Sequence, residues 1–119
     1  MDERVLKWIY DIDFALDEIE SYFQGKEKNF NSYRKNTMLK RAIERDLEII
    51  GEAVNRILKR DPSYENSISD AKAIVGLRNQ VIHAYDSISD ENIWSIVINH
   101  IPKLKKEVTK IIKENPLCI

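Results

Sequence analysis

The chain has 119 residues, of which 43% are hydrophobic and 33% charged, and its formal net charge is −1. This length predicts a single domain over residues 1–119, and the composition excludes a disordered chain. No apolar stretch approaches the ~20 residues of a membrane span, so we expect a cytoplasmic protein without a membrane partner, and the single cysteine, Cys118, excludes an internal disulfide.

The charges are unevenly distributed along the chain. Residues 1–20 carry seven acids and two bases, residues 26–45 carry seven bases and two acids, and residues 103–113 carry five lysines and one glutamate. Two interpretations stay open: these runs are solvated helix faces, or a nearly neutral protein presents a basic face to an anion.

The first predicted helix covers residues 5–23. Its apolar positions recur every three or four residues for five turns, which is helical spacing. Gly25 and the mostly polar run that follows it end this helix. We expect Phe30 and Tyr33 to pack this connection against the core in a short helix.

A second long helix is predicted to begin after Asn36 or Thr37, either of which can cap it, and to run to about Lys59. Gly51 lies inside this helix, where glycine costs about 1 kcal/mol relative to alanine. Such a position predicts the close approach of another helix.

Asp46 falls within the apolar stripe of the second helix. A buried carboxylate needs a partner, because removing it from water alone costs several kcal/mol. Arg78 and His83 are candidate partners for Asp46 in a supporting role. The alternative is that Asp46 lies at the rim of the core and reaches water.

The second half of the chain shows two more periodic segments. A loop from Arg60 to about Ser69 should lead into a third helix capped by Ser69 or Asp70. A fourth helix, capped by Ser89 or Asp90, should follow a short turn at residues 86–89. Pro102 predicts a bend or break at Ile101, because the periodicity resumes in register beyond it. These segments, without a strand signal, predict an all-α antiparallel bundle of four to five helices.

The third helix carries the chemistry. Arg78, Asn79, His83 and Tyr85 lie within eight positions, and His83 is one of two histidines; we interpret the other, His100, as a packing or surface residue. Arginine offers a planar fork of donors for phosphate. Histidine can take a proton from a ribose 2′-hydroxyl or give one to a leaving 5′-oxygen. The alternative interpretation of His83 is a structural role in which hydrogen bonds hold its ring. Histidines with such a role are more common than catalytic ones.

Helical geometry argues against one helix assembling this site alone. At ~100° per residue, Arg78 and His83 lie ~140° apart around the axis. A second copy of the helix, related by a two-fold axis, would line a shared cleft with residues from both chains. The spacing therefore favours a symmetric homodimer.

Residues 78–85 read Arg-Asn-Gln-Val-Ile-His-Ala-Tyr. This segment resembles the signature of the HEPN-domain ribonucleases, and specifically of the HepT-like toxins. Their motif is an arginine, a polar residue, three further residues, a histidine, any residue and a tyrosine. The segment with Gly51-Glu52-Ala53 resembles the second helix of that family, and Ile101-Pro102 resembles a proline in its last long helix.

This resemblance implies a HEPN-like homodimer that cleaves RNA at Arg78 and His83 without a metal or other cofactor. Asn79 would position His83 or the substrate. It further implies a partner, a small nucleotidyltransferase antitoxin of the MntA type, which silences the toxin by transferring AMP to Tyr85. A rival function is a non-catalytic helical dimer that binds nucleotide or docks a nucleotidyltransferase through the same cleft.

Overall fold

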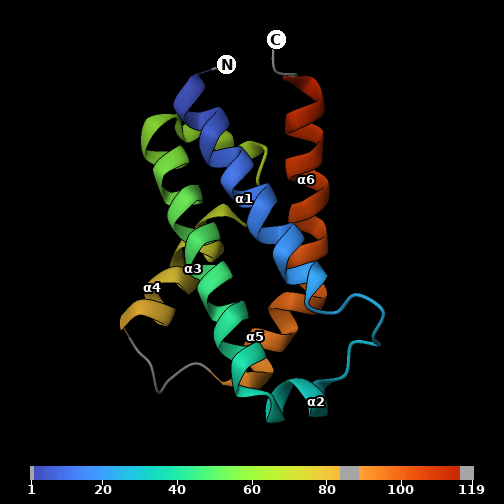
Figure 1. The fold of residues 1–119 in the computed structure, drawn as a ribbon. Helices are drawn as coiled ribbons and strands as arrows, with labels where there is room; N and C mark the ends of the chain where they lie inside the picture. Colours follow the sequence, from blue (N-terminus) through green and yellow to red (C-terminus); the bar gives the residue numbers. More distant parts are fainter. Residues whose placement is uncertain (1, 84–88, 116–119) are drawn as a thin grey trace.

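A computed structural model describes residues 2–83 and 89–115, with the side chains of residues 80–83 left out. Three long helices lie side by side (Figure 1): α1 (Glu3–Ser21), α3 (Thr37–Arg60) and α6 (Ile101–Glu114). Around them are α2 (Phe30–Lys35), the 3-10 helix η1 (Pro62–Asn66), α4 (Ala71–His83), α5 (Asp90–Ser95) and the π-helix η2 (Ile96–His100). The described residues form helices and turns without a strand, which confirms the all-α prediction.

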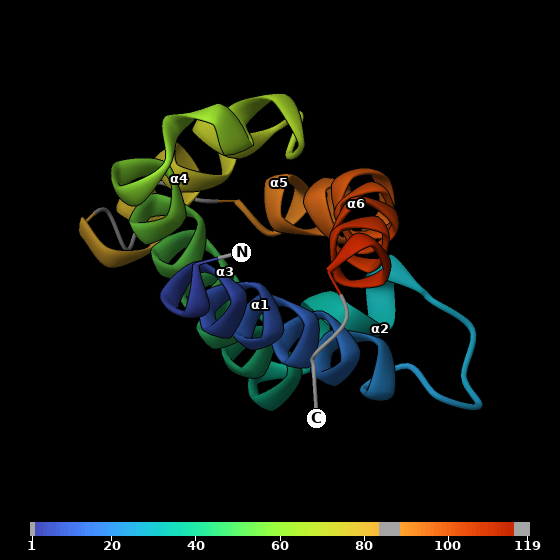
Figure 2. The ribbon, with the colours of Figure 1, turned by 90° about the horizontal axis from the view of Figure 1, so that it is seen from above.

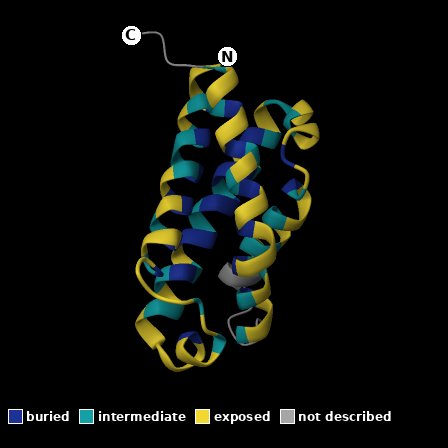
Figure 3. Ribbon diagram, turned by 90° about the vertical axis from the view of Figure 1, so that its right-hand side faces the viewer, coloured by how far each residue is buried: buried dark blue, intermediate teal, exposed yellow. Residues whose placement is uncertain are grey.

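The core lies between α1, α3 and α6, with α1 antiparallel to the other two (Figures 1 and 2). Each of these helices buries one apolar stripe and exposes its opposite face (Figure 3). Burying an Ile or Val side chain contributes about 1.5–3 kcal/mol. The predicted stripes are confirmed at Ile9, Ile12, Leu16 and Ile19 of α1, at Ile43, Leu47, Ile50, Val54 and Ile57 of α3, and at Leu104, Val108 and Ile111 of α6.

Local chemistry fixes where several helices begin. The side chain of Asn36 accepts a hydrogen bond from Leu39 N at 3.0 Å, and that of Ser89 accepts one from Asn92 N at 3.1 Å, so both are N-caps as predicted. The segment after Arg60, predicted to be a loop, contains η1. There Pro62 takes an early helical position and Asp61 Oδ1 accepts a hydrogen bond from Ser63 N at 3.1 Å.

An aromatic cluster closes one end of the bundle. Tyr33 of α2 is buried, and its ring centroid lies 5.1 Å from that of Trp94 in α5. Phe23 and Phe30 complete the cluster, with ring centroids 5.8 and 6.1 Å from Trp94. The predicted short helix at Phe30 and Tyr33 is therefore confirmed.

The break before Pro102 takes the form of η2. Proline has no N–H, and in a regular α-helix its ring would meet the carbonyl group four residues earlier. The π-turn resolves this conflict, because Ile101 N–H donates to Ile96 O, five residues back. α6 then resumes the apolar stripe in register.

Part of the uneven charge is neutralised between helices. Lys105 Nζ of α6 lies 2.6 Å from Asp13 Oδ1 and 2.8 Å from Asp17 Oδ1 of α1. Arg60 Nε, at the end of α3, lies 2.8 Å from Asp2 Oδ2. The acidic first helix thus pairs with bases from distant parts of the chain. None of the described helices has both the length and the apolar character needed to cross a membrane.

Candidate functional site

The helix that carries the predicted site, α4, packs against α3 at the edge of the bundle (Figure 1). The contact depends on Gly51 of α3. A Cβ atom at that position would overlap Arg78 Cβ and lie 3.0 Å from Arg78 Cγ and 3.3 Å from Ile74 O. The close approach predicted from Gly51 is confirmed, and the residue that it admits is Arg78.

Arg78 is held at its guanidinium by two oxygen atoms. Its Nη2 lies 2.6 Å from Glu52 Oε2, and its Nη1 donates a 2.9 Å hydrogen bond to Asn79 Oδ1. The Nε atom is buried, with no hydrogen-bond partner among the described residues. The side chain is 24% exposed, so Arg78 lies in the surface of the fold with a fixed orientation.

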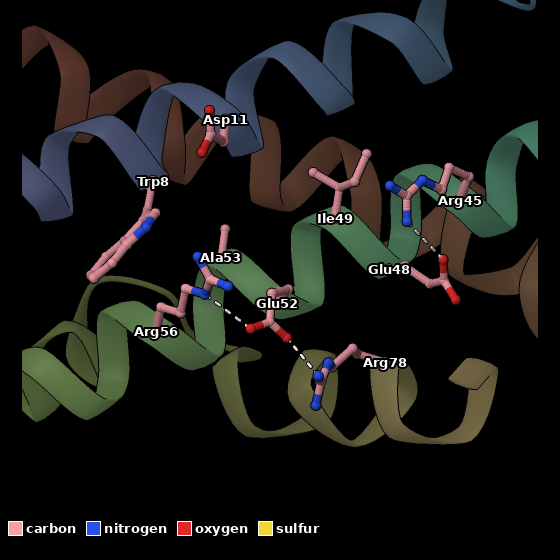
Figure 4. A pocket seen from close by; sticks show the side chains of 9 residues that line it. All are labelled: Trp8, Asp11, Arg45, Glu48, Ile49, Glu52, Ala53, Arg56 and Arg78. Carbon is pink, nitrogen blue, oxygen red and sulfur yellow. Dashed lines mark hydrogen bonds and ion pairs between the residues drawn. The ribbon is translucent and has the colours of Figure 1, made fainter. Parts of the chain in front are cut away.

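A cleft of about 340 Å³ opens beside this group. α1, α3 and α4 all contribute to it, and Figure 4 shows its side chains along the surface of α3. The lining residues are Trp8, Asp11, Arg45, Glu48, Ile49, Glu52, Ala53, Arg56 and Arg78. Three arginines and three acids thus meet in one cleft, beside the half-buried indole of Trp8. Arginines here are suited to a phosphate group.

Glu52 connects two of these arginines. Its Oε1 accepts a 2.9 Å hydrogen bond from Arg56 Nε, and its Oε2 faces Arg78. Sequence reasoning did not identify this role for Glu52. Its place directly after Gly51, at the contact between two helices, was the available signal.

The prediction that Arg78 is the partner of Asp46 is wrong, because Arg78 pairs with Glu52 instead. Asp46 is 2% exposed, so the alternative of a rim position is wrong as well. Its Oδ2 accepts a 2.7 Å hydrogen bond from the Tyr22 hydroxyl, at the end of α1. Tyr22 was missed because it lies outside the apolar stripe of the first helix, and only the helix packing brings it to Asp46.

His83 and Tyr85 lie at the limit of what the structure describes. α4 is helical through His83, so the ~140° separation from Arg78 applies to its backbone. The His83 side chain and all of Tyr85 lie outside the described residues. Asn79 is exposed and binds Arg78.

His100 is a surface residue, as predicted. Its side chain is 51% exposed, and Nδ1 lies 3.2 Å from Asp70 Oδ2. This hydrogen bond lowers the pKa of Asp70.

Comparison with known proteins identifies the family of the chain. The model of the family "Ribonuclease HepT-like" matches residues 12–111. "Putative RNase MJ0125" of Methanocaldococcus jannaschii is 34% identical over 96% of this chain and 97% of its own. "Putative RNase MJ1380" of the same organism is 37% identical over 91% and 97%. "Putative RNase TTE0752" of Caldanaerobacter subterraneus subsp. tengcongensis is 35% identical over 87% and 92%. No solved structure gives a significant match. The chain belongs to the HepT-like ribonuclease family.

Proposed function

We propose that the protein is a dimeric endoribonuclease that cleaves RNA without a metal ion and acts as the toxin of a toxin–antitoxin pair. The observation that carries this proposal is the orientation of Arg78 beside an open cleft, in a chain with the complete Arg-to-Tyr motif of the HepT-like family. The names of the relatives, which describe them as RNases, support RNA as the substrate.

In this mechanism two α4 helices face each other across a two-fold axis. His83 of one subunit removes the proton of the ribose 2′-hydroxyl, and the 2′-oxygen attacks phosphorus. The bond from phosphorus to the 5′-oxygen breaks, and His83 of the partner subunit protonates the leaving oxygen. The products are a 2′,3′-cyclic phosphate and a 5′-hydroxyl end.

Arg78 stabilises the negative charge that develops on the phosphate during this reaction. An oriented donor of this kind is worth several kcal/mol in transition-state stabilisation. Asn79 supports the arginine, consistent with its 2.9 Å hydrogen bond to Nη1. Asp46 has no place in this mechanism, because it is buried against Tyr22.

The experiment compares wild type and His83→Ala on a labelled RNA in the presence of a chelator. Wild type should produce ends with 2′,3′-cyclic phosphate, His83→Ala should leave the RNA intact, and an RNA with 2′-deoxyribose at the cut site should resist both. Equal cleavage by the two proteins, or none by folded wild type that mass spectrometry shows to be free of AMP, contradicts the function. In the latter case, loss of nucleotide binding in His83→Ala would favour the non-catalytic alternative.

We propose that the activity of the toxin is controlled by modification of Tyr85. A nucleotidyltransferase antitoxin of the MntA type would transfer AMP to its hydroxyl, and the bulky anion beside Arg78 and His83 would exclude RNA. Tyr85→Phe should stay active in the presence of that enzyme and ATP, whereas wild type should lose activity and gain the mass of one adenylyl group.

A further inference from the structure

Glu52 is placed between two arginines that come from different helices. Arg56 lies one turn further along α3 and binds Glu52 Oε1 at 2.9 Å, while Arg78 of α4 lies 2.6 Å from Oε2 (Figure 4). The first contact is within one helix, so it holds the carboxylate at a fixed place on α3. The second contact then fixes Nη2 of Arg78, a residue of α4, relative to α3.

The rest of the Arg78 side chain is fixed as well. Its Cβ and Cγ lie against the backbone of α3 in the space that Gly51 leaves, and its Nε is buried. Asn79 Oδ1 accepts from Nη1. Because an arginine loses side-chain entropy when it is immobilised, these contacts remove that cost before a substrate arrives.

The ion pair does not use up the donors of Arg78. Each Nη atom carries two N–H groups, and Glu52 and Asn79 each take a bond at a different Nη. The guanidinium can therefore bind a phosphate oxygen while Glu52 still holds it. An orienting role for Glu52 fits this geometry better than a competing one.

We infer that Glu52 is a positioning residue for Arg78, which it aims into the cleft at the phosphate of the RNA. This inference rests on the proposed function. Glu52 itself does not touch the substrate and acts through Arg78.

Glu52→Gln tests the inference, because glutamine keeps the size of the side chain and one oxygen but removes the charge that holds the guanidinium. The kcat for RNA cleavage should fall by roughly ten- to a hundredfold, since a misplacement of about 1 Å can cost ~100-fold. The KM should stay within about threefold of wild type, because an aimed arginine contributes mainly in the transition state.

The matched control is Glu65→Gln. Glu65 of η1 does not line the cleft, and its Oε1 lies 3.2 Å from Lys72 Nζ of α4. This variant loses the same charge and an ion pair to the same helix without affecting Arg78 or the cleft, so its kcat should equal that of wild type. Thermal unfolding of both variants shows whether either has lost stability.

A second comparison separates positioning from a general structural role. In the Arg78→Ala background, Glu52→Gln should cause no further loss of single-turnover cleavage, because residues that act as one unit are non-additive. A structural effect of Glu52 would lower cleavage in both backgrounds. If Glu52→Gln does not fold, Glu52→Asp keeps the charge but retracts it by one methylene, and should give a smaller loss of kcat with the same non-additivity.

The outcomes also separate this inference from the function on which it rests. No cleavage by AMP-free wild type contradicts the function. Cleavage by wild type with an unchanged or higher kcat for Glu52→Gln overturns the inference alone. An equal loss in the Arg78→Ala background or in Glu65→Gln overturns it as well.

Discussion

The Tyr22 hydroxyl donates a 2.7 Å hydrogen bond to Asp46 Oδ2 and so joins the end of α1 to the buried face of α3. Burial raises the pKa of Asp46 to about 6 even though this bond opposes the shift. Glu18 raises the pKa further, and Arg45 lowers it. The pair therefore holds two helices together and carries a titratable group inside the core.

The stability of the protein should depend on this titration. Asp46 binds its proton more tightly in the folded state than in the unfolded chain, where the pKa of an aspartate is about 3.9. The contribution of this proton binding to the free energy of unfolding is therefore fully present below about pH 4 and is lost as pH rises through about 6. Its size is on the order of 2–3 kcal/mol.

Asp46→Asn measures this contribution, because asparagine keeps an oxygen for Tyr22 and does not ionise. Urea unfolding at several values between pH 4 and 7 should show wild type losing on the order of 2–3 kcal/mol relative to the variant. Parallel pH dependence in the two proteins would contradict the assignment.

Gly51→Ala should lower stability. The added methyl group gains about 1 kcal/mol of helix propensity, but it overlaps Arg78 Cβ, and overpacking of this kind typically costs about 1–3 kcal/mol. We expect a net loss of up to about 2 kcal/mol by urea unfolding.

Gly76→Ala is the matched control for this change. Gly76 lies in α4, and a Cβ atom there would meet nothing within 4 Å. Since only the propensity term remains, this variant should be more stable than wild type by up to about 1 kcal/mol. Equal effects of the two substitutions would show that α4 does not pack tightly at Gly51.

Arg78→Lys should reduce cleavage at least about tenfold. Lysine keeps the charge, but its single ammonium group cannot reproduce the planar fork that joins Glu52 and Asn79 and that, in the proposed mechanism, binds the phosphate. Steady-state kinetics on a fixed RNA, with thermal unfolding as the check of folding, measures the effect. Activity equal to wild type would mean that charge alone suffices at position 78.

Mixed dimers test whether the two subunits share one cleft. A heterodimer of wild type and His83→Ala, isolated with different affinity tags, keeps only one of the two histidines that the proposed mechanism uses. It should therefore cleave RNA at far less than about half of the wild-type rate. A rate of about half would instead mean that each subunit carries a complete site of its own.

Much of the fold follows from sequence pattern because the determinants are local. Apolar residues every three or four positions specify which face of α1, α3 and α6 is buried. The caps Asn36 and Ser89 and the break before Pro102 each depend on hydrogen bonds within a few residues. Gly51 likewise indicated that another helix approaches.

The identities of the contacts across helices depended on the tertiary structure. The pattern offered Arg78 as the partner of Asp46, yet packing gives Arg78 to Glu52 and Asp46 to Tyr22. Helical spacing gives the direction of a side chain around its own axis, but the relative position of two helices depends on all the side chains between them. The sequence alone therefore determined the helices and led to the residues of the candidate site, and only the packing of α4 on α3 decided that Glu52 holds Arg78.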